Sequence, residues 1–189
     1  PHLEKAVQKQ PDSFEAQFYL GLSLTRLNRS ANAIIPFQKA VEIKPESALT
    51  FNYLGQTYQK LKMYPEAIFS YKQATQIEPN LTYAYNKLGT LYTFQKNYEM
   101  AIKMFQGAVQ SNQKFQSGYL NLGMIYEILG RHPEAIEQYN NILSLNPDHQ
   151  KALLNLGWVM MDENRFMEAI PPLKHAIDLN LENTDAHYT

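Results

Sequence analysis

Residues 116–149 read QSGYLNLGMIYEILGRHPEAIEQYNNILSLNPDH, and this stretch decides the fold because its pattern recurs along the chain. Gly123 is its eighth residue, and a glycine recurs in this phase every 34 residues. Glycine inside a helix costs about 1 kcal/mol relative to alanine, so its regular placement needs a packing reason. A fixed period of roughly 20–50 residues is typical of stacked-repeat proteins. The five in-phase glycines are Gly21, Gly55, Gly89, Gly123 and Gly157.

Other positions repeat in the same phase when the glycine is counted as position 8 of each unit. Leucine always precedes the glycine, and alanine always stands at position 20, as at Ala135. Apolar residues at i, i+3 and i+7, such as Tyr119, Leu122 and Tyr126, form one face of a first helix. Position 24 forms the matching face of a second helix with Phe37, Tyr71, Phe105, Tyr139 and Leu173. Each unit is therefore predicted to be a pair of packed helices.

Turn and capping residues mark the predicted helix ends. In residues 116–149 a polar turn covers 129–132, Pro133 opens the second helix and Pro147 ends it. The predicted N-terminal caps include Ser13, Asn80 and Asp148. Prolines inside second helices are expected to remove backbone hydrogen bonds and to bend those helices. These prolines are Pro36, Pro171 and Pro172.

This motif resembles the tetratricopeptide repeat (TPR). The family pattern of aromatic-x2-Leu-Gly-x2-Tyr followed by Ala-x3-aromatic and Pro fits residues 119–147, and a second copy fits residues 51–79. The resemblance covers the whole chain. It implies an all-α fold, a right-handed α-solenoid of stacked antiparallel helix pairs in 34-residue TPR units. It also implies that the first helices line a concave groove that holds peptides or helices of partner proteins.

The repeat phase also predicts how the chain is divided. Residues 1–13 correspond to the second helix of a truncated repeat, and residues 184–189 to the start of a further repeat. We expect the chain to be a fragment of a longer array. The five complete units are residues 14–47, 48–81, 82–115, 116–149 and 150–183.

Composition and motifs argue against several classes of function. The chain has 189 residues, a formal net charge of −1 and no cysteine, so it lacks the basic character of a nucleic-acid binder and any thiol chemistry. No apolar run approaches the roughly 18 residues of a membrane span. The five histidines lack metal-ligand spacing, and no glycine-rich phosphate loop is present. We therefore expect no catalytic residue, no metal and no cofactor, and we predict a protein that is not an enzyme.

Positions 2, 5, 6, 9, 12 and 13 of each first helix turn away from the core, and the last two units are apolar there. Exposed together, six side chains would form a patch large enough to bind a partner, and we predict that they hold the apolar face of an amphipathic helix. The alternative is that some of them pack between neighbouring first helices. The six residues are Leu120, Met124, Ile128, Leu154, Trp158 and Met161.

The same face carries amide side chains, which both donate and accept hydrogen bonds and so suit a peptide backbone. We predict that six polar residues bond to the ligand: Asn52, Gln56, Asn86, Lys87, Asn121 and Asn155. Some relatives bind chaperone tails through a carboxylate clamp. Asn121 and Lys151 fit that clamp, whereas Asn86, Thr90 and Asn155 do not, so clamp-type recognition is not expected.

The leading hypothesis is therefore a scaffold that binds a protein or peptide ligand, without nucleic acid and without membrane insertion. Two alternatives stay open. In the first, the chain self-associates through its groove or its ends. In the second, it is the recruiting arm of a larger enzyme.

Overall fold

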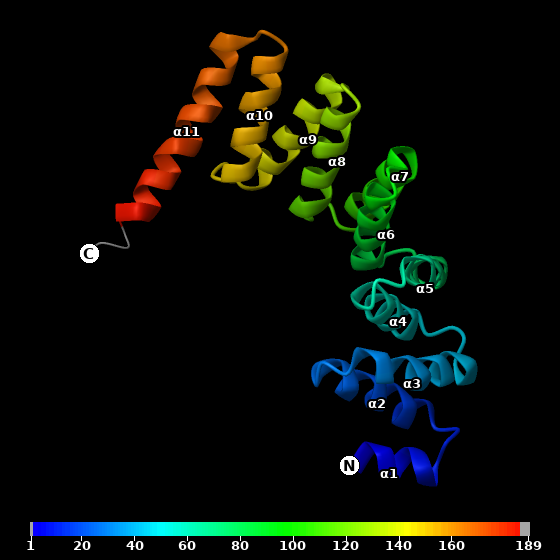
Figure 1. Cartoon of the computed structure of the whole chain (residues 1–189). Helices are drawn as coiled ribbons and strands as arrows, with labels where there is room; N and C mark the ends of the chain where they lie inside the picture. The colour runs from blue at the N-terminus through cyan, green and yellow to red at the C-terminus, as the bar shows by residue number, and fades with distance from the viewer. Residues whose placement is uncertain (1, 186–189) are drawn as a thin grey trace. The chain divides into compact units, whose positions relative to one another are not determined.

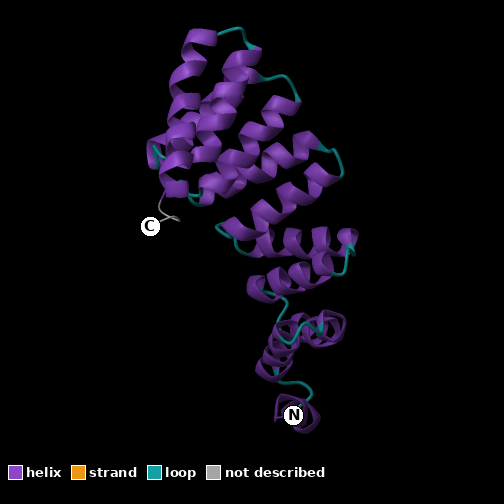
Figure 2. Ribbon diagram, turned by 60° about the vertical axis from the view of Figure 1, so that its left-hand side comes forward, coloured by secondary structure: helices purple, strands orange, loops and turns teal. Residues whose placement is uncertain are grey.

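The computed structural model describes the backbone of residues 2–185 and the side chains of residues 5–179. This part of the chain consists of α-helices joined by short loops and contains no strand (Figure 2). It divides into two compact units, residues 1–95 and residues 96–189, which we call unit 1 and unit 2. Each unit is described separately below.

Unit 1 contains six helices (Figure 1): α1 (His2–Lys9), α2 (Phe14–Arg26), α3 (Ser30–Ile43), α4 (Ala48–Lys60), α5 (Tyr64–Ile77) and α6 (Thr82–Phe94). Unit 2 contains five: α7 (Tyr98–Ser111), α8 (Gln116–Ile128), α9 (His132–Leu145), α10 (Gln150–Asp162) and α11 (Phe166–Asp185). In both units each helix packs against the next one in the chain. Because the connecting loops are short, packed neighbours run antiparallel, which confirms the predicted all-α stack of helix pairs.

The repeated glycines lie where a first helix meets the large residue of its second helix. A Cβ atom added to Gly55 would lie 2.9 Å from Cδ1 of Tyr71, and one added to Gly123 would lie 2.5 Å from Cε1 of Tyr139. Real Cβ atoms essentially never approach a neighbour this closely. Both tyrosines are fully buried. The 34-residue glycine period therefore reflects close contact between a first helix and the large side chain at position 24 of its second helix, as at Gly21, Gly55, Gly123 and Gly157.

A left-handed residue joins the two helices of every complete repeat. It stands at position 15, seven residues after the glycine, and its φ lies between 58° and 67° in all five cases. Only one of the five is glycine, although glycine is the residue that adopts this conformation without a steric cost. The five residues are Asn28, Lys62, Lys96, Gly130 and Asn164.

Two of the three predicted N-caps are wrong by one residue. Ser13 caps α2 as predicted, with its Oγ accepting a hydrogen bond from the Ala16 backbone N–H at 3.2 Å. The N-cap of α6 is Leu81 rather than Asn80, and that of α10 is His149 rather than Asp148. His149 Nδ1 accepts from the Ala152 N–H at 3.2 Å, so an imidazole performs the role expected of the carboxylate beside it.

The second helices continue through the prolines within them. α3 runs through the buried Pro36, and α11 runs through Pro171 and Pro172. α11 also continues past Leu181 to Asp185. Leu181 occupies the position where three other complete repeats carry proline, as at Pro147, so no proline stops α11 there. The missing proline is not a sufficient cause, because α7 ends at Ser111 although Gln113 stands at this position. Of the predicted further repeat, residues 186–189 lie outside the described residues.

Candidate functional site

The six apolar residues predicted for the binding face all lie in unit 2, on α8 and α10. Trp158 is 60% exposed and Ile128 is 56% exposed, and Met124 and Met161 are also exposed. Leu120 and Leu154 are half-buried. The sequence left two alternatives for these residues, binding to a partner or packing between helices, and the structure divides them. Four side chains are exposed and free to bind, and two are partly packed.

A buried tyrosine joins these two helices. Tyr139 extends from α9, and its hydroxyl donates to Oε1 of Glu127 on α8 at 2.9 Å. The same hydroxyl accepts from Nδ2 of Asn155 on α10 at 3.3 Å. Glu127 and Asn155 thus lie within hydrogen-bonding distance of one oxygen atom, so this segment of α8 lies near this segment of α10.

Helical spacing places the exposed apolar side chains beside this hydrogen-bonded group. On α8, Met124 stands three residues before Glu127 and four before Ile128, so all three are surface neighbours. On α10, Trp158 follows Asn155 by three residues and precedes Met161 by three. We call this region the α8–α10 surface, formed by Leu120, Met124, Glu127, Ile128, Leu154, Asn155, Trp158, Met161 and Asp162.

The polar part of the α8–α10 surface is acidic. Burial raises the pKa of the Glu127 carboxyl group above its ordinary value, and the nearby Asp162 raises it further. The hydrogen bond from Tyr139 and the proximity of His132 act in the opposite direction. Asp162 itself is exposed. Two acidic side chains therefore border the four exposed apolar ones.

The predicted polar contacts in unit 1 have a different setting. Asn52 is buried, and its Oδ1 has no hydrogen-bond partner among the described residues. Phe18, at the same repeat position on α2, is buried as well. This position therefore packs between helices on α2 and α4, and Oδ1 of Asn52 is not accessible to a ligand in this structure.

The other predicted polar residues remain partly accessible. Gln56, Asn86 and Lys87 in unit 1 are half-buried, and so is Asn121 in unit 2. The Lys87 ammonium lies over the Tyr83 ring, 5.0 Å from its centroid. Whether these four residues contact a ligand stays a prediction.

The roles of Tyr139 and Glu127 were not predicted, yet the sequence contains a signal for them. When position 24 is tyrosine, position 12 is Gln or Glu, and in unit 1 Tyr71 donates to Oε1 of Gln59 at 3.1 Å. When position 24 is phenylalanine, position 12 is threonine, and Thr25 and Thr93 bond the carbonyls of Gly21 and Gly89 instead. The residue type at position 12 thus varies together with the residue type at position 24. The pairs are Thr25 with Phe37, Gln59 with Tyr71, Thr93 with Phe105, Glu127 with Tyr139, and Met161 with Leu173.

Two other features are absent from the described residues. No group of three or more His, Asp or Glu side chains is placed to hold a metal ion. Within the same part of the chain, no helix combines the length and the apolar character that crossing a bilayer requires.

Comparisons with known proteins agree with this architecture. Family models described as tetratricopeptide repeat match residues 1–48, 48–81, 82–115 and 117–149. The crystal structure of MamA is 25% identical, with a TM-score of 0.81, and the match covers 87% of this chain and 96% of that one. No curated protein sequence matches this chain.

Two further solved structures share the fold. The structure of YrrB, described as a TPR protein with an unusual peptide-binding site, is 22% identical, with a TM-score of 0.81 and coverage of 100% of this chain and 97% of that one. PilF of Pseudomonas aeruginosa is 23% identical, with a TM-score of 0.70 and coverage of 87% and 75%.

Proposed function

We propose that this chain, which belongs to the tetratricopeptide repeat family, holds a peptide segment of a partner protein on its α8–α10 surface. The repeat array is a protein-interaction scaffold, and repeats of this family are generally non-catalytic. YrrB, which shares the fold, is described as having a peptide-binding site.

The observation that carries the proposal is the exposure of Trp158 among other exposed apolar side chains. Tryptophan is strongly enriched among the residues that dominate binding energy, and methionine adapts to ligands of varied shape. Met161 is its neighbour on α10, and Met124 and Ile128 are exposed on α8, which Tyr139 joins to α10, so a ligand would bury apolar area on both helices. An amphipathic helix suits this arrangement, with its apolar side on these four residues.

Acidic and amide groups on the α8–α10 surface indicate which polar groups the ligand carries. Asp162 and the half-buried Glu127 favour lysine or arginine beside the ligand's apolar side. Asn155 already donates to Tyr139, and its carbonyl oxygen is an additional acceptor. We therefore infer an amphipathic peptide helix with basic residues along one edge of its apolar face.

Replacing Trp158 with alanine tests the proposal. The probe is a display library of random peptides selected on the whole chain, followed by a fluorescein-labelled synthetic copy of the most enriched peptide. We expect Trp158→Ala to raise the Kd of this peptide by about 30-fold or more, as for a dominant interface residue. The melting temperature should change little, because the side chain is mostly exposed.

Met167→Ala is the matched control, because Met167 is 80% exposed on α11 and lies outside the α8–α10 surface. It should leave the Kd unchanged. If Trp158→Ala leaves the binding of every enriched peptide unaltered, the proposal is contradicted. A large drop in melting temperature would instead assign Trp158 to packing.

Self-association is the second candidate function, and the exposed face of α11 favours it. Ile170 and Ile177 project from this helix and are exposed. At the position of Ile170, earlier second helices carry Ile102, which is buried, and Ile136, which is half-buried. Burying a side chain of this size contributes about 1.5–3 kcal/mol, so the open face of α11 offers a driving force for dimerisation.

Sedimentation equilibrium across a concentration series measures this directly. We expect the parent chain to show a concentration-dependent rise in average mass, and Ile177→Lys to remove that rise by placing a charge in the contact. A parent chain that stays monomeric at the highest concentration would exclude self-association through α11. Trp158→Ala serves as the control, since it leaves α11 unchanged.

A further inference from the structure

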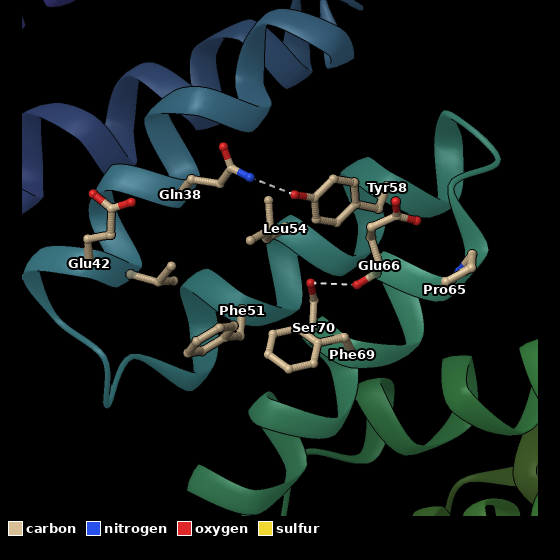
Figure 3. A pocket seen from close by; sticks show the side chains of 10 residues that line it. Gln38, Glu42, Phe51, Leu54, Tyr58, Pro65, Glu66, Phe69 and Ser70 are labelled. Carbon is tan, nitrogen blue, oxygen red and sulfur yellow. Dashed lines mark hydrogen bonds between the residues drawn. The ribbon is translucent and has the colours of Figure 1, made fainter.

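A cavity of about 560 Å3 opens in unit 1 between α3, α4 and α5 (Figure 3). It lies in a different unit from the α8–α10 surface and is formed mainly by second helices and the core-facing side of α4. None of the residues predicted from the sequence to bind a ligand lines it. The proposed function therefore does not involve this cavity.

The cavity has an apolar interior. Phe51 and Tyr58 enter it from α4, where Phe51 is half-buried and Tyr58 is buried. Phe69 from α5 also lines it and is 61% exposed. Nε2 of Gln38 donates to the Tyr58 hydroxyl at 2.9 Å, which fixes that ring at the wall. An aromatic residue as exposed as Phe69 at the edge of an apolar cavity offers a ready contact for an incoming apolar group.

The charges at this cavity have one sign. Its charged lining residues are Glu42 from α3 and Glu66 from α5, and no lysine or arginine lines it. In Figure 3 the two carboxylates stand on opposite sides of the apolar residues. Both residues are exposed, and neither forms an ion pair within the described part of the chain. The rim therefore favours a cation next to an apolar group.

The negative charge of the unit 1 cavity is not a general property of the repeats, as a cavity in unit 2 shows. A cavity of about 430 Å3 between α7, α8 and α9 is lined by Lys114 and by the amide groups of Gln110 and Asn141, without a carboxylate. Position 22 differs as well. It is Phe69 in the repeat that lines the unit 1 cavity, whereas the second helices of unit 2 carry Lys103, Glu137 and Pro171 there.

We propose that the unit 1 cavity is a second peptide-binding site, which takes a partner segment with an apolar side chain next to a lysine or arginine. The apolar side chain packs against Phe51 and Phe69. The neighbouring cation lies at Glu42 or Glu66 and gains from both the carboxylates and the aromatic rings. With one site in each unit, a single chain can bind two segments, either of one partner or of two.

The test selects peptides on a protein in which the other site is disabled. A random peptide display library is panned on the Trp158→Ala variant, and the most enriched peptide is synthesised with a fluorescein label. We expect the enriched sequences to place lysine or arginine beside leucine, isoleucine or phenylalanine. Phe69→Ala should raise the Kd of this peptide at least tenfold, because it removes the main exposed apolar contact.

Two further variants separate the parts of the proposal. The double change Glu42→Gln and Glu66→Gln should weaken binding several-fold and reduce its dependence on ionic strength, since it removes the charges and keeps the shape. Ile35→Ala is the matched control, because Ile35 occupies the same repeat position as Phe69, is 63% exposed and lies outside the cavity. It should leave the Kd unchanged.

Three results would overturn the proposal. The first is that no enriched peptide loses affinity in Phe69→Ala. The second is that the peptides whose affinity falls in Phe69→Ala lack a basic residue. The third is that the double variant with Glu42→Gln and Glu66→Gln binds the peptide with the same Kd as the protein that keeps both glutamates. Since the panned protein lacks Trp158, any of these results leaves the α8–α10 proposal unaffected.

Discussion

Replacing Tyr139 with alanine is expected to lower the free energy of unfolding by about 3–5 kcal/mol, the usual cost of removing a large buried aromatic side chain. The ring is fully buried against Gly123, and the hydroxyl bonds both Glu127 and Asn155. Truncation opens a cavity between α8, α9 and α10 and removes the hydroxyl that joins α8 to α10. Urea denaturation followed by circular dichroism measures the loss.

Tyr139→Phe is the matched control, because it keeps the ring and removes the hydroxyl. We expect a smaller loss of about 1–3 kcal/mol, the net contribution of the two hydrogen bonds that the hydroxyl makes. A loss below about 1 kcal/mol for Tyr139→Ala would mean that this residue does not pack as the structure describes.

Gly123→Ala is expected to destabilise the protein by about 1–3 kcal/mol, although alanine is the better helix former by about 1 kcal/mol. The added methyl group would lie 2.5 Å from Cε1 and 2.6 Å from Cζ of Tyr139. A fully buried ring has little room to move, so α8 and α9 must separate. The same denaturation experiment measures the effect.

The effect of Gly123→Ala on the free energy of unfolding should change sign when Tyr139 is absent. In the Tyr139→Ala background the ring no longer opposes the methyl group, and Gly123→Ala should become neutral or stabilising. Ser117→Ala is the control, since Ser117 is an exposed residue of the same helix and should change stability by less than about 0.5 kcal/mol in either background. Additive effects of the two changes would contradict a direct contact between these residues.

These two predictions depend on the part of the fold that the sequence predicts well. The glycine at position 8 and the alanine at position 20 recur because two helices approach closely there, and that requirement is local to each repeat. Packing between helices that are adjacent in the sequence is enough to require small residues at these two positions. The period and the residue pattern within it therefore predict the helix pairs, the buried aromatic residues at position 24 and the resemblance to the family.

Burial at position 5 was harder to predict. The angle of this position on the helix places it between the core face and the open face, so periodicity does not decide whether a neighbouring helix covers it. In the structure Phe18 and Asn52 are buried, whereas Leu120 and Leu154 are half-buried. The predicted binding face is accordingly narrower than the sequence suggested, and positions 9 and 13 of α8 and position 9 of α10 provide much of its exposed apolar area.

The hydrogen bonds of Tyr139 were missed for a different reason. An aromatic residue at position 24 was interpreted only as core, and its hydroxyl was not assigned a partner. The partners are at position 12 of the same repeat and at position 6 of the next, and helix faces alone do not show that these side chains meet. The signal available in the sequence is that position 12 is Gln or Glu in the two repeats in which position 24 is tyrosine.

The left-handed residue between the helices of each repeat has a consequence for engineering this protein. Lys62 and Lys96 adopt a conformation that costs a side-chain-bearing residue about 1 kcal/mol or more. Both lysines are exposed, and neither belongs to the α8–α10 surface or to the unit 1 cavity. Glycine, already used at Gly130, would relieve the strain at both places. More stable variants of this protein can therefore be obtained by changing these loop residues, without changing the residues proposed to contact a ligand.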